Sequence, residues 1–136
     1  MKLKTLLILA AGLLVFCSCA KKMDEMKQEA VVKFSDQNFK TAISLVELYK
    51  VRHGYYPQTF EEIEFTGDIV DKAAFNSTQY KKLKDGYELN VIPSWTENTA
   101  STTQRKKDSL SLIQNIRYPA AFWKGLGIKK SNLMPQ

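Results

Sequence analysis

The feature that most constrains the fold is the stretch 24–53, which contains neither glycine nor proline. Its apolar residues recur at spacings of three and four positions, the period of an amphipathic helix. These residues are Val32, Phe39, Ala42, Ile43, Val46 and Tyr49. Gly54 can adopt the positive φ that ends a helix, and Pro57 forbids continuation. We therefore expect a long helix that ends at His53 or Gly54.

Beyond this helix the pattern changes to that of a β-hairpin. Residues 87–92 alternate apolar and polar side chains, and the Asp85-Gly86 pair before them is a turn signal, so they should pair with 80–84. Between helix and hairpin, the segment 59–62 begins with threonine and ends with glutamate, a capping box that predicts a short helix. The expected fold class is α+β, a long N-terminal helix packed on a small antiparallel sheet.

The segment 108–118 is ambiguous between strand and helix. Leu110 and Leu112 alternate as in a strand, but Leu112 and Ile116 also have helical spacing. We favour a strand, because a hairpin needs a third partner to be stable in water. The polar run 96–107 before it is expected to be an exposed loop.

The N-terminus has the organisation of an export signal. Residues 1–5 contain two lysines and no acid, and the apolar run 6–16 follows. A bilayer requires about 20 apolar residues, so this run predicts a signal peptide, residues 1–18, and not a permanent span. Both cysteines of the chain, Cys17 and Cys19, follow directly, so the rest of the chain has no disulfide framework.

The segment Phe16-Cys17-Ser18-Cys19 resembles the lipobox of bacterial lipoproteins, in which a small residue precedes a cysteine that is lipidated and becomes the new N-terminus. Ser18 is small, so the resemblance implies acylation, with palmitate among the chains, at Cys19 and not at Cys17. The alternative is a plain secretory signal cleaved near Ser18 or Ala20. Acyl chains would hold the protein on the outer membrane or cell surface.

The residues that follow the cysteine are highly charged. The run 20–25 is similar to lysine-plus-acid tags that export some Gram-negative lipoproteins to the cell surface, and a solvated tether explains it equally well. The expected organisation is a signal peptide at 1–18, a charged tether at 19–30 after the lipidated cysteine, and one globular domain at 31–136.

A tyrosine-rich helix end followed by glycine, an aromatic residue and proline opens the globular domain. These residues are Tyr49, Gly54, Tyr56 and Pro57, with Asp85-Gly86-Tyr87 at the hairpin. The pattern resembles the head of type IV pilins and type II secretion pseudopilins, which implies a pilin-like head. A lipid at Cys19 replaces the apolar helix with which pilins polymerise, so we expect a soluble, monomeric head.

Few residue combinations support catalysis. His53 is the single histidine, and no cysteine lies beyond residue 19, so zinc sites with the usual nitrogen and sulfur ligands cannot be built. At a helix end His53 would contact the last carbonyls and not serve in a triad. No glycine-rich phosphate loop is present. We expect a protein that is not an enzyme and holds no metal or cofactor.

Two other functions stay open. An enzyme acting on envelope polymers would need paired carboxylates, for instance among Asp68, Asp71 and Glu88. Capture of nucleic acid would use basic runs with tyrosines nearby. The residues concerned are Lys81, Lys82, Lys84, Arg105, Lys106, Lys107, Tyr80 and Tyr87. The net charge of +6 is mild, and we do not expect nucleic acid as a partner.

The sequence therefore predicts a lipid-anchored envelope lipoprotein. Its non-catalytic, pilin-like head would bind an unknown protein or glycan partner or have a structural role, and the membrane would be contacted through acyl chains on Cys19. Two short segments, Asn76-Ser77-Thr78 and Asp108-Ser109-Leu110, also resemble bacterial glycan acceptor patterns. Whether Asn76 or Ser109 carries a glycan does not follow from so short a match.

Overall fold

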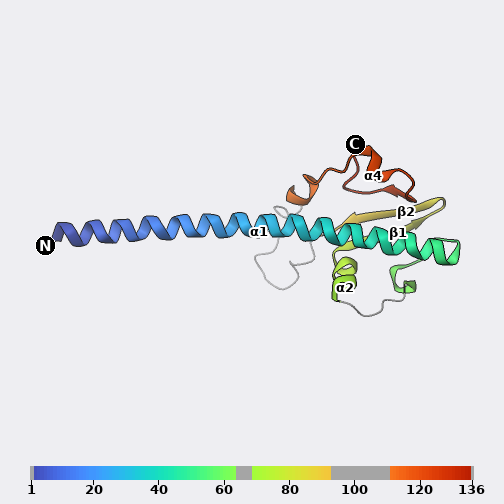
Figure 1. The fold of residues 1–136 in the computed structure, drawn as a ribbon, viewed down its shortest axis with the longest axis horizontal. Coiled ribbons are helices and arrows are strands. Elements are labelled where there is room, and N and C mark those ends of the chain that lie inside the picture. The colour runs from blue at the N-terminus through green and yellow to red at the C-terminus, as the bar shows by residue number, and fades with distance from the viewer. Residues whose placement is uncertain (1, 64–68, 93–110, 136) are drawn as a thin grey trace. The chain divides into compact units, whose positions relative to one another are not determined.

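The structure, a computed structural model, describes the backbone of residues 2–63, 69–92 and 111–135, and the side chains of 22–63, 71–92 and 111–135. The elements in chain order are α1 (Lys2–His53), η1 (Phe60–Glu62), α2 (Ile69–Asn76), β1 (Thr78–Leu83), β2 (Gly86–Val91), α4 (Ala120–Trp123) and β3 (Ile128–Lys130) (Figure 1). Contacts divide the chain into two compact units, residues 1–30 and 31–136.

The first unit is the N-terminal part of α1. Every side chain in 22–29 is exposed, and Asp24 and Lys27 form an ion pair at 3.9 Å. The predicted signal peptide and Cys19 lie where side chains are not described, so both stay predictions. In the part of the chain whose side chains are described, no helix is long and apolar enough to span a membrane.

The helix ends where the sequence predicts. His53 is the last residue of α1, and Gly54 takes a φ of 82° while its N–H donates to the Lys50 carbonyl at 2.8 Å. Basic residues occupy the last turn, where they complement the negative end of the helix dipole. Pro57 follows and is buried in the domain.

The short helix after Pro57 differs from the prediction in kind. Residues Phe60–Glu62 form one 3₁₀ turn, and the Thr59 side chain does not cap it. A hydrogen bond between Thr59 and Glu61 lowers the pKa of the Glu61 carboxyl instead. Glu62 accepts the N–H of Gln58 at 3.1 Å. The predicted capping box is therefore not formed, because the Thr59 side chain pairs with the Glu61 carboxyl and not with a backbone N–H of the turn.

The hairpin is confirmed. Strands β1 and β2 are antiparallel, with Tyr80 opposite Leu89 and Leu83 opposite Gly86. The turn consists of Lys84 and Asp85 and not of the predicted Asp85-Gly86 pair, because Gly86 is already the first residue of β2. Strand β3 adds to β2 in parallel, giving a mixed sheet in the order β1-β2-β3.

The third strand does not come from the segment predicted for it. Residues 111–114 are helical, and 108–110 lie outside the described residues. The preference for a strand in 108–118 is therefore wrong. The C-terminal strand Ile128–Lys130 already supplies the partner that the hairpin needs, and the helical turn places Ile113 in the core. The predicted loop at 96–107 lies outside the described residues.

The core lies between the C-terminal half of α1, the hairpin and the C-terminal segment. Ile43 and Val46 of α1 are buried together with Leu89 and Val91 of β2, which confirms the expected contact of helix and sheet. The other buried apolar residues are Phe39, Ala42, Ile63, Ala74, Tyr87, Ile113, Tyr118, Ile128 and Leu133. The fold is α+β, as the sequence predicts.

Candidate functional site

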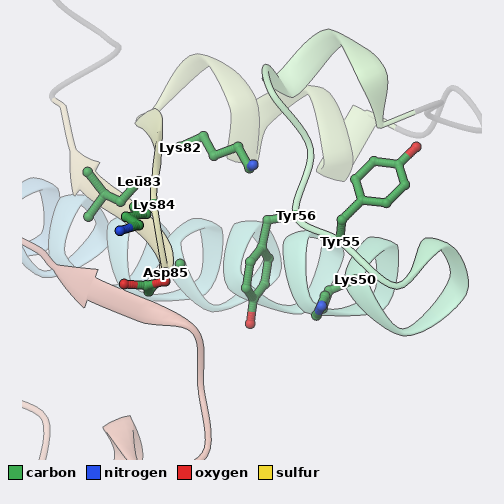
Figure 2. A pocket seen from close by; sticks show the side chains of 8 residues that line it. Lys50, Tyr55, Tyr56, Lys82, Leu83, Lys84 and Asp85 are labelled. Atoms are coloured by element: carbon green, nitrogen blue, oxygen red, sulfur yellow. The ribbon is translucent and has the colours of Figure 1, made fainter.

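A pocket of about 280 Å³ lies between the end of α1 and the tip of the hairpin. We call it the hairpin pocket. Its lining residues are Lys50, Tyr55, Tyr56, Lys82, Leu83, Lys84, Asp85 and Gly86. Figure 2 shows these side chains coming from three places, namely α1, the loop that follows it, and the hairpin. The pocket thus exists only because the chain reverses after Gly54 and brings that loop beside the β1–β2 turn.

Lysine dominates the charge of this pocket. Its lining contains three lysines and a single carboxylate, that of Asp85. The Lys50 ammonium donates to the Gly54 carbonyl and lies 5.5 Å from the centre of the Tyr56 ring, a cation–π contact. A Cβ added at Gly86 would lie 3.1 Å from Cγ of Lys129, so a fourth lysine is adjacent to the turn. The site therefore favours an anion.

Tyrosine rings supply the apolar part of the pocket. The Tyr56 hydroxyl donates to Glu47 at 3.2 Å, which fixes the ring, and burial raises its pKa. Tyr55 is 52% exposed and meets Tyr49 in a T-shaped contact at 5.9 Å. A hydrogen bond with Tyr55, together with burial, raises the pKa of Tyr49 to about 12. Tyr55 is therefore the more exposed of the two rings that line this pocket.

Behind the pocket, the Glu47 carboxylate accepts three hydrogen bonds. Tyr87 donates its hydroxyl at 2.9 Å and Gly127 its N–H at 2.7 Å, in addition to Tyr56. Burial, and then the nearby Glu47 charge, raise the pKa of Tyr87 far above its ordinary value. A Cβ at Gly127 would lie 1.9 Å from the Tyr56 hydroxyl, so only glycine fits there. Glu47 is thus a structural junction between α1, β2 and the segment before β3.

The position of Glu47 in the sequence already indicates a structural role. Glu47 follows Ile43 by four positions and is adjacent to Val46, so it lies on the face of the helix that turns to the core. A carboxylate there must find hydrogen-bond donors, because burial of an unpaired charge is costly. Tyr56 and Tyr87 are the side chains that donate to it.

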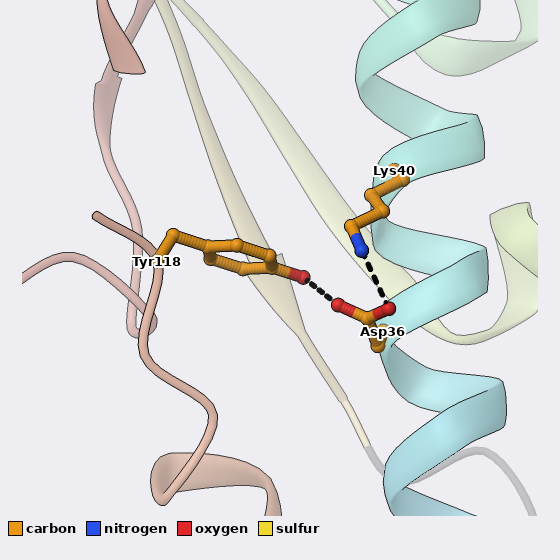
Figure 3. A network of polar contacts seen from close by, with 3 residues as sticks. All are labelled: Asp36, Lys40 and Tyr118. Atoms are coloured by element: carbon orange, nitrogen blue, oxygen red, sulfur yellow. Dashed lines mark hydrogen bonds and ion pairs between the residues drawn. The ribbon is translucent and has the colours of Figure 1, made fainter. Parts of the chain in front are cut away.

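A second carboxylate junction lies further toward the N-terminus of the same helix (Figure 3). Asp36 accepts the Tyr118 hydroxyl at 2.6 Å and the Lys40 ammonium at 2.7 Å. Tyr118 also stacks on Phe122, with ring centroids 4.2 Å apart, and on Phe39 at 5.7 Å. Burial, followed by the hydrogen bond to Asp36, raises the pKa of Tyr118. This junction holds the C-terminal aromatic residues against α1.

Neither of the tyrosines considered for nucleic-acid capture is a fully exposed ring. Tyr87 is fully buried, and the Tyr80 hydroxyl donates to the Pro57 carbonyl at 2.6 Å while its ring stacks on Phe60. Lys82 and Lys84 line the hairpin pocket, whereas Lys81 is exposed and outside it. The basic run 105–107 lies outside the described residues.

Two of the carboxylates considered for catalysis, Asp71 and Glu88, are not part of this pocket. Asp71 lies in α2, and Glu88 in β2 accepts the side-chain N–H of Asn90 at 2.9 Å. Asp68 lies outside the described residues. Within the described ranges, no group of three or more His, Cys, Asp or Glu residues is arranged to hold a metal.

The other residues singled out in the sequence have local surroundings. His53 stacks on Tyr49 with ring centroids 4.2 Å apart, at the end of α1. Asn76 is exposed at the end of α2, while the hydroxyls of Ser77 and Thr78 donate to the carbonyls of Ala73 and Ala74, both at 2.7 Å. Ser109 lies outside the described residues.

Comparisons of the chain with models of protein families, with curated proteins and with solved structures find no match.

Proposed function

We propose that this chain is a lipid-anchored envelope lipoprotein, held on the outer membrane or cell surface by acyl chains on Cys19. The observation that carries the proposal is the order of features at the N-terminus. Two lysines precede the apolar run 6–16, and Ser18 then precedes Cys19. An apolar run of this length followed by a small residue and cysteine is typical of a lipoprotein signal.

The second unit supports a self-contained, non-catalytic head. Phe39 and Val46, on the apolar stripe of α1, are fully buried, and Leu89 and Val91 of β2 belong to the same core. Since the stripe is covered by the domain's own residues, the head has no need of a second subunit to fold. A soluble domain of this kind requires a separate anchor, which the acyl chains would provide.

The order of elements supports the pilin-like part of the proposal. A long helix ends at His53, Gly54 and Pro57 follow, and one short helical turn precedes the antiparallel hairpin. These are the features on which the resemblance to pilins and pseudopilins is based. The head would bind a protein or glycan partner or have a structural role.

Replacement of each cysteine in turn tests the anchor. We expect labelled palmitate to be incorporated into the wild-type chain and the Cys17→Ala variant, and both to sediment with membranes. Cys19→Ala should incorporate none and remain soluble or unprocessed, because the acceptor thiol is absent. Palmitate retained on Cys19→Ala, or absent from the wild-type chain, would contradict the lipoprotein proposal.

Sedimentation equilibrium tests the monomeric head. A chain that begins at Ala30 should sediment as a monomer at all concentrations, because its apolar stripe is already buried. A concentration-dependent oligomer that Val32→Glu abolishes without unfolding would contradict this. Val32 is the suitable position, since it is half-buried, whereas Phe39 is fully buried and its substitution would unfold the domain.

A further inference from the structure

The hairpin pocket contains more positive charge than the fold itself neutralises. Within the described side chains, no carboxylate lies within ion-pair distance of Lys82 or Lys84. Among the residues that the structure describes, Asp85 is the one acid that lines the pocket. Like charges gathered around one hollow are unfavourable for folding and raise the local concentration of anions. Binding of an anion would relieve this repulsion.

The pocket also presents an aromatic face beside the lysines. The Tyr56 ring is held by the hydrogen bond to Glu47 and covered by the Lys50 ammonium, so it forms a rigid wall. Tyr55 leaves about half of its surface to solvent. A ligand that fits must therefore combine an anionic group with a compact ring whose face can pack against an aromatic side chain.

We propose that the hairpin pocket binds an acidic saccharide unit, a sugar ring that bears a carboxylate or a phosphate. Lys82 and Lys84 would donate charge-assisted hydrogen bonds to the anion, and the sugar's C–H face would pack on Tyr55. This inference rests on the proposed function, since it names the glycan partner of a head that is located at the envelope. At about 280 Å³ the pocket is near the small end of ligand sites and suits one ring.

The arrangement of rings favours a saccharide over a nucleic-acid strand. Proteins that bind single strands stack successive bases on several aromatic side chains along a basic groove. Here Tyr80 is tied to Pro57 and Tyr87 lies fully in the core, so neither ring is free to stack. A single accessible tyrosine in the pocket matches a single sugar ring.

The first test varies the ligand and leaves the protein unchanged. The full chain in detergent is titrated with oligogalacturonate and with its methyl ester, which keeps the rings and lacks the charge. We expect the ester to bind about tenfold more weakly or worse, because charge-assisted hydrogen bonds are lost. Mannose 6-phosphate, titrated in parallel, shows whether phosphate replaces carboxylate. Equal binding of acid and ester, or no binding of either anionic sugar, would overturn the proposal.

The second test varies the protein. The double variant Lys82→Gln, Lys84→Gln should weaken binding of the preferred anionic sugar by about tenfold, and Tyr55→Leu should also weaken it. Lys81→Gln is the matched control, because Lys81 lies on the same strand outside the pocket and should change affinity by less than about twofold. An equal effect of the control and the double variant would overturn the pocket as the site.

Two further outcomes separate this proposal from others. Oligothymidylate that binds more tightly than either sugar, with the same dependence on Lys82 and Lys84, would overturn the saccharide proposal and assign a nucleic-acid site.

The titrations are repeated with Cys19→Ala to separate the pocket from the anchor. A wild-type chain without lipid that still binds the sugar contradicts the anchor alone, and a lipidated chain that binds none contradicts the pocket alone.

Discussion

The Asp36 junction and the hairpin pocket are two polar regions of one domain. They differ in whether their charged side chains are paired with one another. At Asp36, one carboxylate accepts from Tyr118 and Lys40, so every charged group in the junction has a partner. In the hairpin pocket, three lysines share a lining with one carboxylate. Polar groups that satisfy one another stabilise the fold, whereas charges left toward solvent are available to a ligand.

The Glu47 junction resembles the Asp36 junction, because its polar groups are paired, although it lies behind the hairpin pocket. Its carboxylate accepts hydrogen bonds from Tyr56, Tyr87 and Gly127. The bond from Tyr56 fixes the ring that forms the wall of the pocket. The comparison therefore predicts that changes in the interior alter stability, and that changes at the pocket lining alter binding while stability is nearly constant.

The largest expected effect comes from the buried stripe of α1. Ile43→Ala should lower the free energy of unfolding by about 1–4 kcal/mol, because it leaves a cavity between helix and sheet. Val51→Ala is the control on the same helix, since Val51 is 80% exposed, and should change it by less than about 0.5 kcal/mol. Urea unfolding of both variants is the measurement. A small effect at Ile43 would contradict the proposed packing of helix and sheet.

The next effect concerns the Glu47 junction. Glu47→Gln removes the charge of an acceptor of three hydrogen bonds and should lower the free energy of unfolding by about 1–3 kcal/mol. Glu61→Gln is the control, because Glu61 is exposed. Equal free energies of unfolding of the two variants in urea would show that the junction does not stabilise the fold. The junction would then not differ from the pocket lining in its effect on stability.

The interior tyrosines predict a loss of stability in alkali. Burial raises the pKa of Tyr87 and of Tyr118 above their values in the unfolded chain. Above about pH 10 the unfolded chain releases these protons while the folded chain keeps them, so stability should fall as the pH rises. Urea midpoints at pH 8 and pH 10.5 measure this fall. Tyr118→Phe should reduce this fall, because it removes one of the tyrosines whose pKa is raised by burial. A fall of the same size in Tyr118→Phe and in the wild-type chain would contradict this.

The smallest effect is expected at the solvent side of the Asp36 junction. Lys40→Gln removes an ion pair whose lysine side chain is 51% exposed, so it should lower the free energy of unfolding by only about 0.3–0.5 kcal/mol. Added salt should diminish the difference from the wild-type chain. If Lys40→Gln lowered the free energy of unfolding as much as Glu47→Gln, the exposed ion pair would contribute as much stability as the Glu47 junction, which would contradict this prediction.

Local patterns explain why part of the fold could be predicted from the sequence. The helix end depends on Gly54 and Pro57, and the hairpin depends on a turn and the alternation that follows it. The third strand depends on a long-range parallel pairing of Tyr87 with Ile128. Strand β3 has only three residues, of which one is buried, so its sequence shows no alternation of apolar and polar side chains. The strand predicted within 108–118 is wrong, because residues 111–114 are helical and the hairpin's partner is the more distant strand Ile128–Lys130.

The candidate site was only partly predictable for the same reason. The sequence shows Lys82 and Lys84 as basic residues with Tyr80 and Tyr87 nearby, but not which of these side chains line a pocket. The alternation that predicts strand β2 already assigns Tyr87 to the face of Leu89, which is buried. Tyr55 and Tyr56 reach the pocket through the chain reversal after Gly54, and no local pattern encodes which hairpin lysines they meet.

The parallel third strand also determines when this domain can fold. The side chain of Asn132 pairs with both backbone groups of Val91, accepting its N–H at 3.0 Å and donating to its carbonyl at 2.9 Å, and Leu133 fills the core beside it. The first strands therefore lack their neighbour until synthesis has passed residue 133. Contacts so distant along the chain close slowly. A polypeptide with this topology can complete its sheet only after nearly the whole chain has been synthesised.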